Sequence, residues 1–212
     1  MKDPKDYGSI VFDMGHVLAE YNSRKAIERF TDDPAIVDEV RIIVYCSYEW
    51  ALLDCGLMDE ETVLRYTLHR LSCEEAREVA RKSIACWDSY NLWPKPGMDG
   101  VIKALKARGQ KVYVLSNAGM RLMDCWRRVL PCPDLYDGVV FSAPEKCMKP
   151  QKEIYGVLFD RYDLDPADCL FIDDLPWNVK GGQDCGMDGW CFASGDVGEL
   201  KKFLRLEGTT DN

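Results

Sequence analysis

The sequence predicts an α/β protein with a three-layer, Rossmann-like core, in which a parallel sheet lies between helices, and with a helical cap inserted into that core. Two observations support this prediction. Along most of the 212-residue chain, short apolar runs alternate with segments of helical periodicity. One early stretch, from about residue 24 to residue 88, has helical periodicity and no strand pattern. Alternating strands and helices are typical of a parallel sheet covered on both faces.

The apolar runs have the features of buried parallel strands. They are short, rich in β-branched and aromatic residues, and lack the alternation of a half-exposed strand. The predicted strands are Ser9–Phe12, Val112–Leu115, Gly138–Phe141, Cys169–Ile172 and Trp190–Phe192.

Helical segments separate these strands, and two of them are followed by a glycine that can end a helix. The predicted helices are Met98–Arg108, Met120–Val129, Gln151–Tyr162 and Asn178–Cys185. Right-handed crossovers bring the carboxyl ends of parallel strands to one edge of the sheet, where ligands usually bind.

The early helical stretch follows the first strand directly, so it lies where a lid over that edge would lie. Three amphipathic examples are residues 23–30, 59–66 and 72–79, and the last two begin with the capping residues Asp59 and Ser72 followed by acidic first turns. We therefore divide the chain into a core and a cap. The core is residues 1–20 and 93–212, and the cap is residues 21–92.

Composition limits the possible partners. The formal net charge of -9 disfavours binding to nucleic acid or to an anionic membrane, and no apolar run reaches the roughly 20 residues of a membrane span. The ten cysteines form no C-x-x-C pair, and the chain starts without a secretion-signal pattern. We expect reduced thiols in a cytoplasmic protein that acts on a small molecule, and the oligomeric state stays open.

Four groups of polar residues follow the predicted strands. Asp13 leaves the first strand into a turn with Gly15, and alone it fits a nucleophile or a turn former equally well. Ser116 and Asn117 end the second strand, where they either bind a ligand or cap the next helix.

The other two groups lie in the second half of the chain. Lys149 precedes a helix and can hold a phosphate, although a Lys-Pro pair is also common in solvated loops. Asp173 and Asp174 leave a buried strand together. Two adjacent carboxylates there are costly unless they are paired or bind a cation, so they predict a metal site.

The order Asp, Ser-Asn, Lys, Asp-Asp at four strand ends resembles the haloacid dehalogenase superfamily, in its phosphatase branch with a helical cap after the first motif. The resemblance covers nearly the whole chain. Residues 148–155 and 171–178 look similar to sugar-1-phosphate phosphatases and to the phosphatase domain of soluble epoxide hydrolases.

This resemblance implies a phosphomonoester hydrolase that depends on Mg²⁺. The Asp13 carboxylate would attack phosphorus and form an aspartyl-phosphate, which water then hydrolyses. Mg²⁺ would bind Asp13, the Gly15 carbonyl oxygen and Asp174, a set of oxygen ligands that suits a hard cation.

The same resemblance assigns the remaining residues. Ser116, Asn117 and Lys149 would hold the phosphoryl oxygens, and Asp173 would orient Lys149 or a metal-bound water. Phosphatases of this superfamily usually have a second Asp at the position of Gly15, which protonates the leaving group. Its absence predicts a preference for good leaving groups, such as sugar 1-phosphates, acyl phosphates or aryl esters.

Several residues keep two interpretations. His16 can supply the missing acid or bind phosphate, or it is a polar turn residue. Glu20 and Tyr21 either line the pocket or form a solvated hinge. The tryptophans at positions 50, 87 and 93 either stack on a sugar or belong to the core.

Two other functions compete with a phosphatase. A 2-haloacid dehalogenase also uses a strand-end Asp and lacks the second Asp, although it needs no metal and usually lacks the acidic pair. A catalytically silent phosphate-binding protein would keep the pocket without proton transfer.

Overall fold

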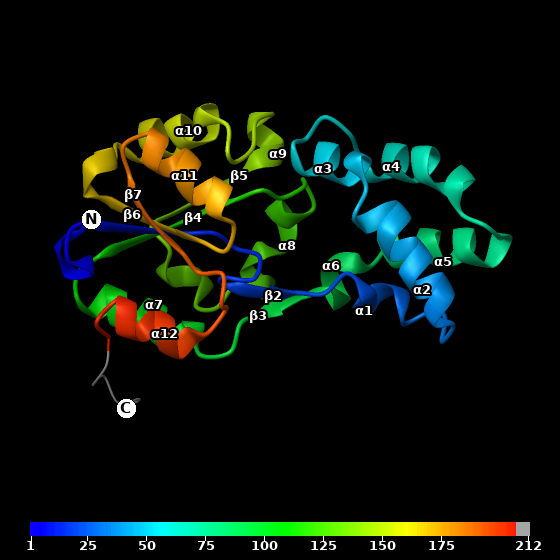
Figure 1. Cartoon of the computed structure of the whole chain (residues 1–212), viewed down its shortest axis with the longest axis horizontal. Helices are drawn as coiled ribbons and strands as arrows, with labels where there is room; N and C mark the ends of the chain where they lie inside the picture. The colour runs from blue at the N-terminus through cyan, green and yellow to red at the C-terminus, as the bar shows by residue number, and fades with distance from the viewer. Residues whose placement is uncertain (207–212) are drawn as a thin grey trace.

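The computed structural model describes residues 1–206 and contains a parallel sheet with a group of helices beyond one edge (Figure 1). The sheet has five strands in the order β5-β4-β1-β6-β7, and every neighbouring pair is parallel. Their bounds are β1 Ser9–Phe12, β4 Lys111–Ser116, β5 Gly138–Phe141, β6 Cys169–Asp173 and β7 Asp188–Cys191.

Helices cover both faces of this sheet (Figure 1). Within β1, Ile10 and Phe12 belong to one buried cluster and Val11 to the other, as expected for alternating side chains. The helices that pack on the first cluster are α7 Met98–Ala107, α8 Leu122–Val129 and α12 Val197–Phe203. On the second cluster lies α10 Lys152–Tyr162, and α11 Pro176–Asp184 contacts β6 and β7. The predicted α/β class and three-layer core are confirmed.

The edge strand β7 begins two residues before the predicted start at Trp190, because Asp188 and Gly189 pair with Leu170 and Phe171 of β6. All four residues of β7 are partly exposed. An edge strand of this kind need not be a continuous apolar run, so its polar first residue obscured its start.

Between residues 22 and 91 the described chain contains helices, joined by short loops, and no strand. They are α1 Arg24–Ile27, α2 Pro34–Val40, α3 Tyr48–Asp54, α4 Glu60–Thr67, α5 Glu74–Ile84 and α6 Trp87–Tyr90, with a π-helical turn at Arg41–Tyr45 and a 3-10 turn at Leu68–Arg70. None of the helices in the described part of the chain is long and apolar enough to cross a membrane.

The two predicted helix caps differ in outcome. Asp59 accepts a hydrogen bond from the Thr62 amide and caps α4 as expected. Ser72 does not cap α5, because its amide and hydroxyl both donate to the Glu39 carboxylate, at 2.6 and 2.9 Å. The capping residue of α5 is Cys73.

A short antiparallel hairpin joins these helices to the sheet. It pairs β2 Ala19–Tyr21 with β3 Leu92–Pro94, the strands that precede and follow the helical segment in the sequence. The two strands lie side by side between the sheet and the helices (Figure 1). The Lys95 ammonium lies 2.6 Å from the Glu20 carboxylate and braces this connection. The sequence pattern did not indicate the hairpin because each strand has only three residues.

A second contact ties the far end of α3 to the core, at the helix α9 Ser142–Glu145. The Ser142 hydroxyl donates to the Asp54 carbonyl oxygen, and the Lys146 ammonium donates to the Gly56 carbonyl oxygen. Gly56 has a φ of 71°, and a Cβ at this position would lie 2.0 Å from the Ala143 carbonyl oxygen. Only glycine allows this close approach, which fixes the end of α3 against the sheet domain.

Candidate active site

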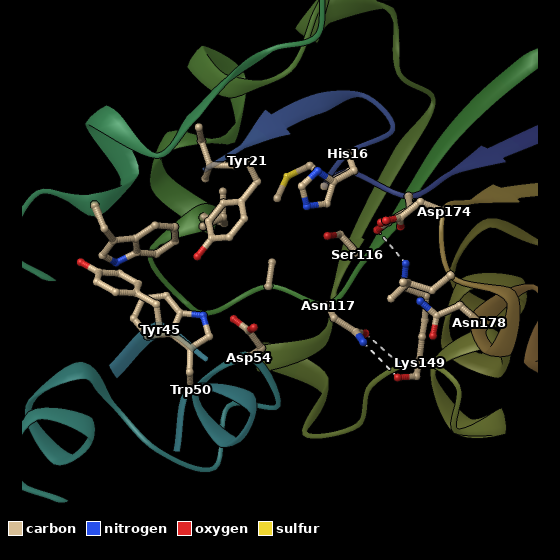
Figure 2. A pocket seen from close by; sticks show the side chains of 18 residues that line it. His16, Tyr21, Tyr45, Trp50, Asp54, Ser116, Asn117, Lys149, Asp174 and Asn178 are labelled. Atoms are coloured by element: carbon tan, nitrogen blue, oxygen red, sulfur yellow. Dashed lines mark hydrogen bonds and ion pairs between the residues drawn. The ribbon is translucent and has the colours of Figure 1, made fainter. Parts of the chain in front are cut away.

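The carboxyl ends of the central strands open into one cavity of about 440 Å³. Asp13 follows β1, Ser116 ends β4 and Asp174 follows β6, and all three line this cavity together with Asn117 and Lys149. Figure 2 shows Ser116, Asn117, Lys149 and Asp174 gathered at one side of it. The strand order places β1 between β4 and β6, which brings the separate motifs together.

Lys149 connects the nucleophile candidate to the acidic pair. Its buried ammonium lies 2.7 Å from an oxygen of Asp13 and 2.7 Å from an oxygen of Asp173. Burial lowers the pKa of Lys149, but the two carboxylates outweigh it and hold this pKa above its ordinary value. Lys149 therefore stays charged in the buried site.

Asn117 fixes the backbone of Lys149. Its side-chain amide donates to the Lys149 carbonyl oxygen at 2.9 Å, and its side-chain oxygen accepts from the Lys149 amide at 2.8 Å. The helix α8 begins only at Leu122, and no side chain caps it. Neither Ser116 nor Asn117 is a helix cap, so the alternative that the sequence left open is wrong.

Asp173 is fully buried and holds Lys149 in place. One of its oxygens accepts from the Leu175 amide at 2.9 Å, and the Asn178 side chain donates to both oxygens at 3.0 and 3.1 Å. With every contact directed to protein groups, Asp173 has the geometry of a positioning residue.

Three carboxylates can share one metal ion here. Asp13, Asp173 and Asp174 each offer an oxygen within 4.8 Å of the others. Burial raises the pKa of Asp13 to about 7 although Lys149 opposes this effect, and burial together with Asp173 raises the pKa of Asp174. One ammonium does not neutralise three carboxylates, so the site fits a divalent cation, and its oxygen donors suit Mg²⁺.

The position that lacks the second Asp is open. A Cβ built on Gly15 would have no atom within 4 Å, so the structure has room for a side chain there. His16, with a φ of 59°, lines the cavity, and its ring lies 6.1 Å from that of Tyr21, centre to centre.

The opposite wall of the cavity comes from the cap and is mainly aromatic. Tyr21, Tyr45, Trp50 and Trp87 line it, and the two tryptophan rings pack edge to face at 5.4 Å. Of the residues that the sequence left ambiguous, Tyr21, Trp50 and Trp87 thus reach the cavity. Glu20 pairs with Lys95 instead, and Trp93 lies on the hairpin with 38% of its surface exposed.

The cap also contributes Asp54, which sequence reasoning missed. Figure 2 shows its carboxyl group directed into the cavity, opposite His16 and Ser116. Burial raises the pKa of Asp54 to about 8, although an amide of Gly119 donates to this carboxyl group and lowers it. An acidic residue at the end of a short helix gives no pattern that distinguishes it from a solvated one.

The sequence matches the family of haloacid dehalogenase-like hydrolases over residues 9–186. The chain therefore belongs to this family and is a hydrolase. Its fold places Asp13, Ser116 and the acidic pair at strand ends, as the sequence resemblance implied, whereas Lys149 lies in the loop between α9 and α10.

Curated relatives include both phosphatases and dehalogenases. A sesquiterpene phosphatase of Aspergillus oryzae is 26% identical over 86% of this chain and 88% of its own length. Flavin mononucleotide hydrolase 1 of Arabidopsis thaliana is 25% identical over 69% of this chain and 58% of its own length. An (S)-2-haloacid dehalogenase of a Pseudomonas species is 25% identical over 66% of this chain and 60% of its own length.

Solved structures with the same fold cover nearly the whole chain. A haloacid dehalogenase-like hydrolase from Porphyromonas gingivalis has a TM-score of 0.69 and 22% identity, covering 94% of this chain and 98% of its own. A family enzyme from Bacteroides thetaiotaomicron, in complex with magnesium and inorganic phosphate, has a TM-score of 0.66 and 19% identity, covering 92% of this chain and 98% of its own.

Proposed function

We propose that the protein is a Mg²⁺-dependent phosphomonoester hydrolase that acts through an aspartyl-phosphate on Asp13. The observation that carries this proposal is the single cavity in which Asp13, Lys149 and Asp174 meet Ser116 and Asn117. The phosphatases among the curated relatives and the magnesium and phosphate complex of the Bacteroides enzyme support the same reaction.

In this reaction the Asp13 carboxylate attacks phosphorus, and the bond to the leaving oxygen breaks. Lys149 and the Ser116 hydroxyl hold the phosphoryl oxygens, together with Asn117. Asp173 keeps the Lys149 ammonium in place through the 2.7 Å ion pair.

Asp13, the Gly15 carbonyl oxygen and Asp174 are the proposed metal ligands. When bound, Mg²⁺ supplies positive charge that offsets the repulsion between the phosphoryl group and the carboxylates. His16, on the same side of the cavity, is a further phosphate-binding candidate.

The substrate in this proposal is a small phosphorylated metabolite, with a sugar 1-phosphate favoured. In this proposal the cap, residues 21–92, covers the strand ends with aromatic rings that can pack against a sugar ring. Tyr21 and Trp50, which line the cavity, are two of these rings. The ten cysteines are all unpaired, which supports a cytoplasmic location.

Asp13→Asn tests the mechanism directly. Without a nucleophilic carboxylate, the steady-state kcat for p-nitrophenyl phosphate with Mg²⁺ should fall by roughly a thousandfold or more. Asp160→Asn, at an exposed position of α10, is the matched control and should keep wild-type kcat. Full turnover by Asp13→Asn would show that the proposed mechanism is wrong.

The acidic pair favours a phosphatase over a 2-haloacid dehalogenase, and turnover separates a phosphatase from a silent phosphate-binding protein. A 2-haloacid dehalogenase has no need for Asp173 and Asp174, which here lie within 4.8 Å of Asp13. Chloride release from 2-haloacids in the absence of Mg²⁺ would favour the dehalogenase. Substrate binding that depends on Mg²⁺ but leads to no turnover would favour a silent phosphate-binding protein.

A further inference from the structure

Asp54 is a carboxyl group in the cavity that the proposed mechanism does not use. It ends α3 in the cap and faces the cavity (Figure 2). Within residues 1–206, no ion pair is found for this carboxyl group, and the backbone amide of Gly119 is the polar neighbour that lowers its pKa. Asp54 is only partly exposed. A carboxyl group that is largely removed from water and has no cation beside it is costly to keep ionised, which makes it a candidate for a function.

The location of Asp54 links it to the phosphate-binding loop. Gly119 follows Ser116 and Asn117, which belong to the proposed phosphate site, by only a few residues. The Ser142 hydroxyl accepts from the Ala118 amide at 2.8 Å and donates to the Asp54 carbonyl oxygen. The end of α3 is therefore fixed beside the loop that would hold the phosphoryl group.

The surroundings keep the Asp54 proton in place. Tyr21 on β2 is the titratable group that interacts with Asp54, and Tyr45 and Cys46 in turn interact with Tyr21. Gly119, from the core side, offers a neutral amide. Burial raises the pKa of Asp54 to about 8, so the Asp54 side chain is protonated in most protein molecules at neutral pH. A protonated carboxyl group is a donor, which is the property that Gly15 lacks.

We propose that Asp54 is the general acid and base of this phosphatase, in the place of the second Asp that Gly15 replaces. This assignment rests on the proposed function. As the bond between phosphorus and the leaving oxygen breaks and the Asp13–phosphorus bond forms, the Asp54 proton moves to the leaving oxygen. The Asp54 carboxylate then takes a proton from the water that attacks the aspartyl-phosphate. This step releases phosphate, frees the Asp13 carboxylate and returns Asp54 to its protonated form.

Two aromatic substrates of similar size separate this role from simple binding. The p-nitrophenolate ion leaves without much help, whereas benzyl phosphate releases an alkoxide that needs a proton. With Mg²⁺, Asp54→Asn should lower kcat for benzyl phosphate by about 10²- to 10⁴-fold and kcat for p-nitrophenyl phosphate by less than about tenfold. The fall in wild-type activity on benzyl phosphate above about pH 8 should disappear in this variant. Asp32→Asn, an exposed position in the cap, is the control and should match the wild type.

Other outcomes overturn the assignment. Equal losses on both substrates would indicate a structural or binding role for Asp54, and no loss on either would exclude any role. If His16→Ala loses turnover of benzyl phosphate and Asp54→Asn does not, the general acid is His16 and not Asp54. A wild-type protein that hydrolyses p-nitrophenyl phosphate but not benzyl phosphate would lack a working acid. This result would contradict the role proposed for Asp54 and leave the proposed phosphatase function intact. A wild-type protein that hydrolyses neither contradicts the proposed function itself.

Discussion

Lys149 holds two buried carboxylates together, those of Asp13 and Asp173, each 2.7 Å from its ammonium group. Removing this charge would leave both carboxylates without their cation in a buried site. Charge balance at this residue should therefore contribute to folding, in addition to the phosphate-binding role proposed for Lys149.

Lys149→Met should lower the free energy of unfolding by roughly 3–5 kcal/mol in buffer without divalent cations, since it leaves buried charges unpaired. Urea denaturation measures this loss. Lys180→Met, which removes an exposed lysine of α11, should stay within about 0.5 kcal/mol of the wild type. A similar stability for the two variants would contradict the importance of the buried pair.

Asp54 should make stability depend on pH. Its folded-state pKa of about 8 lies above that of an unfolded Asp, so the folded state binds the extra proton between roughly pH 4 and pH 8. The contribution of Asp54 to the free energy of unfolding is fully present below about pH 4, and it is lost as the pH rises toward 8. Thermal unfolding at pH 5 and pH 8 should show Asp54→Asn gaining at least about 2–4 °C relative to wild type at the higher pH. A constant difference between the two proteins would contradict the raised pKa.

Residues that directly follow a strand were within reach of sequence reasoning, and Asp54 was not. Asp13, Ser116 and Asp174 each come next to an apolar run, and parallel strands bring such ends to one edge. Asp54 lies on the helix α3, which contacts α9, and its carboxyl group lies beside the Gly119 amide; both are far away in the sequence. Its place in the cavity depends on how the cap docks, which helical periodicity does not specify.

At the scale of elements, the contact between α3 and α9 depends on Gly56. Gly56→Ala places a methyl group against the Ala143 carbonyl oxygen, where it would lie 2.0 Å away, and it also strains a backbone φ of 71°. Gly109→Ala has a similar strain, with a φ of 86°, but its Cβ would meet no atom within 4 Å. The pair therefore separates the close contact from the backbone strain.

We expect Gly56→Ala to be less stable than Gly109→Ala by about 1–3 kcal/mol, as for other overpacked sites. Chemical denaturation of both variants measures the difference. Because Gly56 follows Asp54 closely, Gly56→Ala should also lower kcat on benzyl phosphate, whereas Gly109→Ala should not. Equal stabilities would mean that the end of α3 shifts freely against the core.

The sequence pattern predicts the buried strands of the sheet but not the hairpin that joins the cap to it. The buried strands β1, β4, β5 and β6 were predictable because burial on both faces requires apolar runs. The hairpin of β2 and β3 was not, since its strands are short and pair across about 70 intervening residues of the cap. Its position explains how the helices of the cap attach to the core.

At the scale of the whole molecule, Mg²⁺ should stabilise the fold by reducing the repulsion among Asp13, Asp173 and Asp174. At 100 times its dissociation constant, a bound ion adds about 2.7 kcal/mol, which corresponds to a rise in Tm of roughly 5–10 °C for a chain of this size. Differential scanning fluorimetry with Mg²⁺ and with chelator measures this rise. Asp174→Asn should reduce it, and Asp184→Asn, an exposed position on α11, should not. A Tm that does not respond to Mg²⁺ would contradict the metal site.

The central place of β1 has a consequence for how the protein is made. Ser9 pairs with Lys111 on one side and with Cys169 on the other, so β1 leaves the ribosome roughly 100 residues ahead of one neighbour and roughly 160 residues ahead of the other. At about 5–20 residues per second, this apolar segment waits for many seconds. During that interval Ile10, Val11 and Phe12, all fully buried in the finished protein, are open to chaperones and to aggregation.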